Sequence, residues 1–182
     1  MSRPLLFVVT GPPASGKTSV AEKLAERLKV PFVSKDTFKE VLYEVFGSGE
    51  ALEERIDAAG LAILFAVAES QLAAGVSVAT ESNFDADTDV APFRRLADTY
   101  DVQVVQIHIG GDVDELVEKF VRRAESGERH PGHGDDAGDA DDLRAKLESG
   151  LWKPLDLPGL LVEADLHEDE ESIVSRVHAA LD

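Results

Sequence analysis

The sequence predicts an α/β fold in which a parallel sheet is covered by helices on both faces. Two observations lead to this prediction. Five short apolar runs have the composition of buried strands, at 5–10, 32–34, 76–80, 103–109 and 160–162. Between most of them lie segments whose apolar residues recur with helical spacing. Alternating strands and helices are typical of βαβ units, which place helices on both faces of a parallel sheet.

The elements follow one another along the chain without an internal repeat. The first strand runs into a Gly/Pro cluster, as a buried strand does when it enters a turn. Helices are expected at 17–28, from Asp36 as N-cap to the glycines at 47 and 49, at 51–74, and from about 90 to 100. Asp112 and Glu115 have the spacing of a capping box and predict a further helix. The last helix is expected to contain residues 173–181.

The chain has 182 residues, a length that favours one domain spanning 1–182. Segment 126–142 departs from the strand and helix patterns. It contains four glycines, one proline and an acidic run. We interpret this segment as a mobile lid, either a loop throughout or a loop with a short helix.

The composition excludes several function classes. Lys and Arg total 18 against 36 for Asp and Glu, a net charge of -18, so general nucleic-acid binding is not expected, although a small basic site stays open. The acidity fits either a salty cytosol or an ordinary acidic protein. The absence of cysteine excludes disulfides and thiolate chemistry. The longest wholly apolar run, 61–68, is too short to cross a bilayer, and no signal pattern is visible, so a cytoplasmic protein without a membrane partner is expected.

A complete phosphate-binding loop lies between the first predicted strand and the first predicted helix. Residues 11–18 read Gly-Pro-Pro-Ala-Ser-Gly-Lys-Thr and match G-x-x-x-x-G-K-[ST]. In this motif backbone N–H groups face phosphate oxygens and the helix N-terminus favours negative charge. Lys17 is expected to contact the β- and γ-phosphates, and Thr18 to ligate Mg²⁺. The expected nucleotide-binding residues are Gly11, Pro12, Pro13, Ala14, Ser15, Gly16, Lys17, Thr18 and Ser19.

Further motifs extend this signal over nearly the whole chain. They are Val33-Ser-Lys-Asp-Thr-Phe-Lys39, Thr80-Glu-Ser-Asn83, Arg122-Arg123, Arg129-His-Pro-Gly-His133 and Lys153-Pro-Leu-Asp-Leu-Pro158. Together with the phosphate loop, the sequence resembles the small P-loop kinases often labelled AAA-type ATPases, which are similar to polynucleotide 5′-hydroxyl kinase domains, zeta toxins, and chloramphenicol and gluconate kinases. The resemblance implies a three-layer sandwich like that of the nucleoside-monophosphate kinases, with strand order 2-3-1-4-5. It also implies ATP as donor and phosphoryl transfer to a hydroxyl group.

Polar residues follow the second and third predicted strands. Asp36 is expected in the crevice at the strand ends, and the resemblance implies that it is the catalytic base; the alternative is a helix N-cap alone. Lys39 is taken as a substrate contact, although an exposed helix face remains open. Asn83 is expected to bind substrate. Glu81 either holds Mg²⁺ through water or is a strand-end acid without such a role.

Arginines are expected to supply positive charge near the transferring phosphoryl group. Arg123 and Arg129 flank the lid and are predicted to be catalytic, because guanidinium groups stabilise that charge bidentately. Two adjacent arginines cannot both face one ligand from a helix, so Arg122 is assigned to a pair with Glu118.

Three other side chains have two interpretations each. His130 and His133 could suggest a metal, but hydrogen bonding within the lid is favoured because no helical i,i+4 pair of ligands accompanies them. Trp152 either stacks on a base or packs in the core or at a hinge.

The function predicted from these residues is that of an ATP-dependent kinase of a small hydroxylated acceptor, with Mg²⁺ as cofactor. Two alternatives remain open. One is a polynucleotide 5′-hydroxyl kinase, against which the net charge of -18 argues. The other is a nucleotide-binding regulatory or toxin-like module. The sequence leaves the oligomeric state open.

Overall fold

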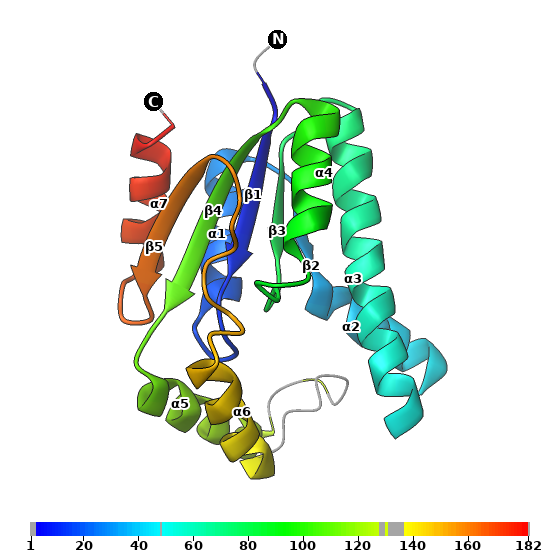
Figure 1. Cartoon of the computed structure of the whole chain (residues 1–182), viewed down its shortest axis with the longest axis vertical. Helices are drawn as coiled ribbons and strands as arrows, with labels where there is room; N and C mark the ends of the chain where they lie inside the picture. Colours follow the sequence, from blue (N-terminus) through cyan, green and yellow to red (C-terminus); the bar gives the residue numbers. More distant parts are fainter. Residues whose placement is uncertain (1–2, 48, 128–129, 131–136, 182) are drawn as a thin grey trace.

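The computed structural model describes residues 3–47, 49–127, 130 and 137–181 (Figure 1). The elements, in chain order, are β1 Leu5–Thr10, α1 Lys17–Leu28, β2 Phe32–Ser34, α2 Lys35–Phe46, α3 Glu50–Ala73, β3 Val78–Glu81, α4 Val90–Tyr100, β4 Gln103–Gly110, α5 Val113–Ser126, the 3-10 helix η2 Ala137–Asp139, α6 Ala140–Glu148, β5 Leu160–Asp165 and α7 Glu170–Ala179.

The five strands form one parallel sheet in the order β2-β3-β1-β4-β5. This confirms the predicted α/β class and the strand order implied by the resemblance to small P-loop kinases. Strand β1 lies in the centre, so the loop that leaves its carboxyl end begins in the middle of the sheet edge. In the register of the sheet, Glu81 pairs with Val9 on one side and with Ser34 on the other.

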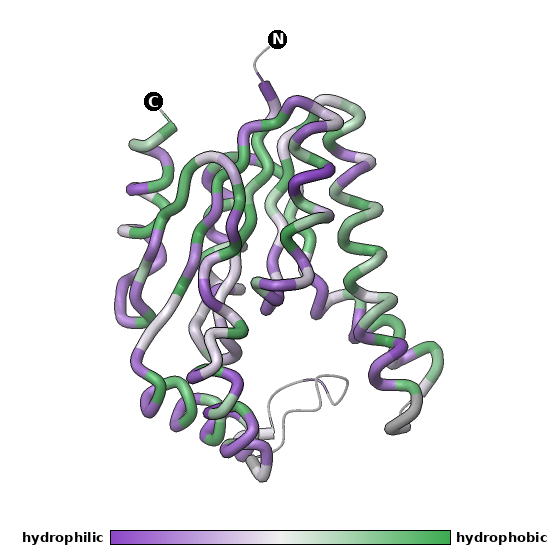
Figure 2. The backbone as a smooth tube through the Cα atoms, viewed as in Figure 1, coloured by the Kyte–Doolittle hydropathy of each residue, from purple (hydrophilic) through white to green (hydrophobic). Residues whose placement is uncertain are grey.

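The core consists of two apolar layers, one on each face of the sheet (Figures 1 and 2). Alternate side chains of β1 enter opposite layers, because successive side chains of a strand point to opposite faces. Leu6 and Val8 pack with residues of α3 and α4, whereas Phe7 and Val9 pack with residues of α1 and α7. All four side chains are fully buried. Each contributes about 1.5–3 kcal/mol relative to an exposed position.

Helix α3 is the one described helix that is long and apolar enough to span a membrane, judged by length and composition alone. The apolar stretch covers Leu52–Ala73, with a mean hydropathy of 1.5. In this fold one face of the helix packs on the sheet, where Leu64, Ala68 and Leu72 are buried in the core. The sheet therefore accounts for the apolar character of that face.

Several predicted boundaries are wrong by a few residues. Strand β3 begins at Val78 rather than at Val76, which is 40% exposed. Strand β5 continues to Asp165 beside β4. Helix α2 begins at Lys35, because the Ser34 hydroxyl accepts a hydrogen bond from the backbone N–H of Asp36 at 3.3 Å. Ser34, not Asp36, is therefore the N-cap of this helix.

The predicted lid, 126–142, is only partly described. Helix α5 ends at Ser126, and Gly127 follows in the left-handed conformation. The chain then includes η2 and the start of α6 at Ala140, which agrees with the alternative of a loop with a short helix. Residues 128, 129 and 131–136 lie outside the described part. In Figure 1, α5 and α6 lie below one side of the sheet edge, and α2 and the N-terminal part of α3 lie below the other.

Candidate active site

The phosphate loop depends on glycine at its two ends. Gly11 has a φ of 145°, and a Cβ atom there would lie 2.2 Å from the carbonyl oxygen of Ile109. Any other residue would collide with the backbone of β4. Gly16 has a φ of 88° and is the N-cap residue of α1. Between them, Ser15 N donates to the Pro12 carbonyl at 3.4 Å. The loop therefore curls back on itself just before the positive end of the α1 dipole.

Lys17 and Glu81 form a buried ion pair beneath this loop. The Lys17 Nζ lies 3.9 Å from Glu81 Oε1 and donates to the Pro12 carbonyl at 3.2 Å. The Ser34 hydroxyl donates to Glu81 Oε2 at 2.7 Å. The Glu81 side chain is only 1% exposed. A buried carboxylate needs such partners to offset its desolvation, so this network fixes the Lys17 ammonium group where the loop can present it to phosphate.

A cleft of about 730 Å³ lies in front of the loop and brings most of the predicted site residues together. The predicted residues that line it are Pro13, Ala14, Gly16, Lys17, Thr18, Ser19, Asp36, Lys39, Asn83 and Arg123. Four residues that were not predicted as ligand contacts also line it, namely Lys35, Asp57, Lys119 and Arg122. Gly11, Pro12, Ser15 and Glu81 are not among the lining residues. Arg129 lies outside the described residues.

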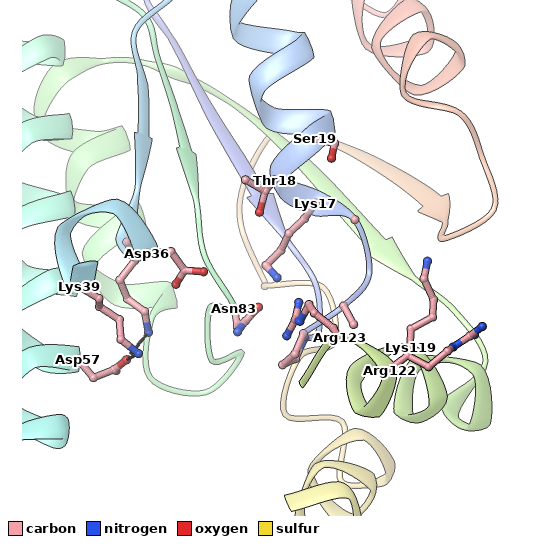
Figure 3. A pocket seen from close by; sticks show the side chains of 14 residues that line it. Lys17, Thr18, Ser19, Asp36, Lys39, Asp57, Asn83, Lys119, Arg122 and Arg123 are labelled. Atoms are coloured by element: carbon pink, nitrogen blue, oxygen red, sulfur yellow. Dashed lines mark hydrogen bonds and ion pairs between the residues drawn. The ribbon is translucent and has the colours of Figure 1, made fainter. Parts of the chain in front are cut away.

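Side chains from different elements line this cleft (Figure 3). The Asp36 carboxylate, on the first turn of α2, is directed into the cleft. Asn83, which follows β3, lies between Asp36 and Arg123. The Oδ1 atom of Asn83 is buried and has no hydrogen-bond partner among the described residues. A buried acceptor costs free energy unless a donor reaches it, so Asn83 is well placed to accept a hydrogen bond from a bound molecule.

Two arginines of α5 lie beside the loop in different surroundings. The Arg123 guanidinium lies over the Phe120 ring, 5.6 Å from its centroid. Arg122 lies 3.5 Å from Glu118, the pair expected from their spacing along the helix. Arg122 nevertheless contributes to the lining of the cleft. Positive charge thus faces the phosphate loop from α5.

The cleft is basic although the chain is strongly acidic. Six of the 18 lysines and arginines line it, but only two of the 36 acidic residues do so within the described part of the chain. Such a concentration of positive charge attracts anions in spite of the overall net charge. The net charge therefore argues against anion binding over the surface as a whole, but not against anion binding in this cleft.

The residues present fit Mg²⁺ bound together with a nucleotide. Thr18 lines the cleft at the first turn of α1, and the Glu81 carboxylate is engaged by Ser34 and by Lys17, the residue before Thr18. Within the described ranges, no group of three His, Cys, Asp or Glu side chains could hold a metal ion by itself. Mg²⁺ commonly keeps several waters and takes few protein ligands besides substrate phosphates. A hydroxyl and a nearby carboxylate satisfy that requirement.

Two side chains whose role the sequence left open, His130 and Trp152, have packing partners in the structure. The His130 ring meets Tyr43 of α2 edge-on at 5.5 Å, and His130 Nε2 lies 3.8 Å from Glu44 Oε1. His133 lies outside the described residues. Trp152 packs against a small cluster of α5 and α6 residues and lines a second cavity of about 320 Å³ that also contacts Pro12. This position agrees with packing at the base of α6.

The family model described as AAA domain matches residues 6–142, a stretch that includes the phosphate loop, Asp36, Asn83 and Arg123. The chain belongs to the AAA domain family. Among solved structures, a "putative kinase" from Chloroflexus aurantiacus is 35% identical, with a TM-score of 0.88 and 100% of both chains covered. No curated protein matches the chain.

Two more distant structures share the fold of this AAA domain protein. A gluconokinase from Sinorhizobium meliloti is 21% identical, with a TM-score of 0.60 and coverage of 99% of this chain and 93% of the other. A shikimate kinase from Bacteroides thetaiotaomicron is 20% identical, with a TM-score of 0.60 and 99% of both chains covered. These neighbours confirm the expected similarity to small P-loop kinases.

Proposed function

We propose that this AAA domain protein is an ATP-dependent kinase that transfers the γ-phosphoryl group to a hydroxyl of a small acceptor. The observation that carries the proposal is the position of Asp36. Its carboxylate is directed into the same cleft that the phosphate loop lines, from a different wall (Figure 3). A nucleotide-binding module without transfer chemistry has no need of an acid there.

In the proposed mechanism, the Lys17 ammonium and the backbone N–H groups of the non-proline residues of 11–19 bind the β- and γ-phosphates of ATP. The two prolines of this segment have no N–H to donate. Thr18, with Glu81 acting through water, would hold Mg²⁺, which supplies charge neutralisation between the phosphates. Asp36 accepts a hydrogen bond from the acceptor hydroxyl, aligns it with the γ-phosphorus and takes its proton as the new P–O bond forms. The bond between the γ-phosphorus and the oxygen that bridges it to the β-phosphate breaks, and ADP leaves with that oxygen.

Other side chains orient the acceptor and stabilise charge in this mechanism. The buried Asn83 Oδ1 accepts a hydrogen bond from the acceptor, and Lys39 contacts it from α2. Arg123 stabilises the charge that develops on the transferring phosphoryl group. Arg129 is proposed to act with Arg123, although its position is not described. Segment 126–142 is proposed to act as the lid, in a single domain spanning 1–182.

The deciding experiment separates transfer from hydrolysis. Purified protein is mixed with ATP, Mg²⁺ and pools of small hydroxyl compounds, and both ADP and inorganic phosphate are measured. The proposal expects ADP in excess of phosphate with at least one pool, and no such excess with Lys17→Met. ADP matched by phosphate in every pool would contradict it. A 5′-hydroxyl oligonucleotide is included, because its phosphorylation would favour the polynucleotide alternative instead.

A further inference from the structure

We propose that the α2–α3 wall of the cleft binds an anionic group of the acceptor, so that the substrate is a hydroxyl compound carrying a carboxylate or a phosphate. The inference rests on the proposed kinase function and specifies its substrate class. The site consists of Lys35, Lys39, Asp57 and Gly60, which we name the lysine clip.

The lysine clip is held together by one carboxylate that bridges two ammonium groups. The Lys35 Nζ lies 3.0 Å from Asp57 Oδ1 and donates to Oδ2 at 3.1 Å. The Lys39 Nζ lies 2.9 Å from Asp57 Oδ1. The two lysine side chains are only 13% and 16% exposed, whereas Asp57 is 45% exposed. Lysines on a freely solvated helix face would be far more exposed, so these two side chains are built into the wall.

Gly60 provides the room for this arrangement. It lies one turn after Asp57 on α3, and a Cβ atom there would lie 3.1 Å from Lys39 Cγ and 3.4 Å from Lys35 Cγ. The stems of both lysines therefore run against the backbone of α3. Glycine is among the poorest helix formers, so its presence in the middle of a long helix is explained by this close approach.

The lysine clip contains two ammonium groups and one carboxylate, so its formal net charge is positive. Asp57 offsets one of the two ammonium charges within the cluster. In a further acid, Asp89, burial raises the pKa, and Lys35 lies close enough to act more weakly in the opposite direction. The N-terminus of α2, which begins at Lys35, adds its partial positive charge at the same place. Partial burial alone would raise the pKa of Asp57, but the neighbouring Lys35 and Lys39 outweigh it and lower the pKa below its ordinary value. Asp57 therefore remains an anion, and the cluster remains a net cation, at neutral pH.

The position of the lysine clip separates it from the nucleotide phosphates. Figure 3 shows Lys39 and Asp57 on one wall of the cleft, and Lys119, Arg122 and Arg123 on the opposite side. The phosphate loop lies with the second group. The Asp36 carboxylate lies between them, next in sequence to Lys35. An acceptor that places its hydroxyl at Asp36 would thus meet the lysine clip with a neighbouring group, and a carboxylate or phosphate is the group that ammonium donors bind best.

The test uses acceptors matched in all but charge. Glucose, gluconate and glucose 6-phosphate form one series, and glycerol, glycerate and glycerol 3-phosphate form another. Phosphoryl transfer from ATP is measured for each compound. Thermal stabilisation by each compound is measured separately, in the presence of a non-hydrolysable ATP analogue, so that binding is observed without turnover. We expect transfer and stabilisation with the carboxylate or the phosphate members and not with glucose or glycerol.

The Lys35→Met/Lys39→Met variant keeps the aliphatic stems and removes both charges. It is expected to raise the KM for the anionic acceptor about 10- to 100-fold, with the KM for ATP changed less than about twofold. Gly60→Ala should raise the acceptor KM in the same direction, because it displaces both stems. The matched control is Lys23→Met, which removes a lysine paired with Glu171 outside the cleft and should leave both KM values unchanged.

The outcomes separate this inference from the proposed function. Transfer to neutral members only, or an unchanged acceptor KM in the double variant, overturns the lysine clip as an anion site and leaves the kinase proposal intact. Anion-dependent stabilisation that the double variant loses supports the site even if no tested compound is phosphorylated. Phosphorylation of a 5′-hydroxyl oligonucleotide, but of none of the small anions, overturns the proposed substrate class. A preference for carboxylate over phosphate, or the reverse, identifies which anion the site takes.

Discussion

The Nζ atom of Lys17 lies 3.9 Å from Oε1 of Glu81, an acid that is almost completely enclosed at the end of β3. The pair joins the phosphate loop to the neighbouring strand. The same ammonium group donates a hydrogen bond to the Pro12 carbonyl. The ion pair and this hydrogen bond together hold the lysine in place without a nucleotide. Pre-positioned charge is effective in catalysis because little reorganisation is needed during the reaction.

Lys17→Met should abolish most turnover, by about 100-fold or more, because the cation that meets the β- and γ-phosphates is gone. The variant should also unfold at lower urea concentration, since it leaves the buried Glu81 without that charge. Adding Glu81→Gln should recover part of the lost stability and none of the activity. Urea titration followed by circular dichroism measures stability, and ADP release measures turnover. Wild-type turnover in the single variant would refute the assignment of Lys17.

Asp36→Asn should reduce acceptor phosphorylation by about 100- to 10,000-fold, because the base for the hydroxyl proton is lost. The fold should be unaffected, since the cap of α2 is Ser34 and the Asp36 backbone N–H remains available to it. Melting temperature and ATP affinity are measured beside transfer. Full transfer activity in this variant would show that Asp36 is not the base.

Ser34→Ala should have the opposite pattern to Asp36→Asn: it should lower stability more than it lowers acceptor phosphorylation. The hydroxyl accepts from Asp36 N at 3.3 Å and donates to Glu81 Oε2 at 2.7 Å. Its removal should cost about 1–3 kcal/mol of unfolding free energy, measured in urea. Ser34→Thr, which keeps a hydroxyl, is the control and should lose less. Equal stability of Ser34→Ala and wild type would mean that neither hydrogen bond contributes.

Asp57→Asn should lower stability at neutral pH and not in acid. Burial acts to raise the pKa of Asp57, but Lys35 and Lys39 together hold it below the ordinary value of 3.8. A lowered pKa adds stability above the unfolded-state value, and this stability is lost as the pH falls through the folded-state value. The difference between wild type and variant should therefore begin to shrink as the pH approaches 3.8 and vanish only below the folded-state pKa of Asp57, which lies under 3.8.

Because Asp57 is partly exposed, solvent screening limits this difference to about 1 kcal/mol or less at neutral pH. High salt should reduce it further. Urea unfolding at several pH values, with and without added NaCl, measures both dependences. A difference that grows in acid would contradict the sign of the shift.

The elements that could be predicted from sequence have strong local patterns. The β1 strand, the phosphate loop and α1 follow one another within about two dozen residues, and each has its own signal in the residues nearby. The start of α2 was placed wrongly because Ser34 and Asp36 are both good caps, and only the backbone geometry shows which one acts. Helix α6 was anticipated only as a possible short helix within 126–142, and its continuation to Glu148 was not predicted, because its acidic first turn continues a glycine-rich segment. The strand order came from the family resemblance and not from the pattern of residues.

The lysine clip could not be predicted because its members are distant in the chain. Lys35 and Asp57 are separated by 22 residues and lie on different helices. No local spacing connects them. The nearest signal is the pairing of an acid with a glycine one turn later, Asp57 and Gly60, just before the apolar run 61–68 of the helix. Such a pair indicates that a polar side chain from another element packs closely here. Which side chain it is depends on how α2 packs against α3, and the sequence does not show that.

The chain contains a single tryptophan. The Trp152 carbonyl accepts a hydrogen bond from His108 Nε2 at 2.9 Å, and the residue lines a cavity whose other wall includes Pro12 of the phosphate loop. An indole in such a place is a spectroscopic probe that needs no label. We expect its emission to respond to a nucleotide bound at the loop, so that binding and release of nucleotide can be followed in real time on the unmodified protein.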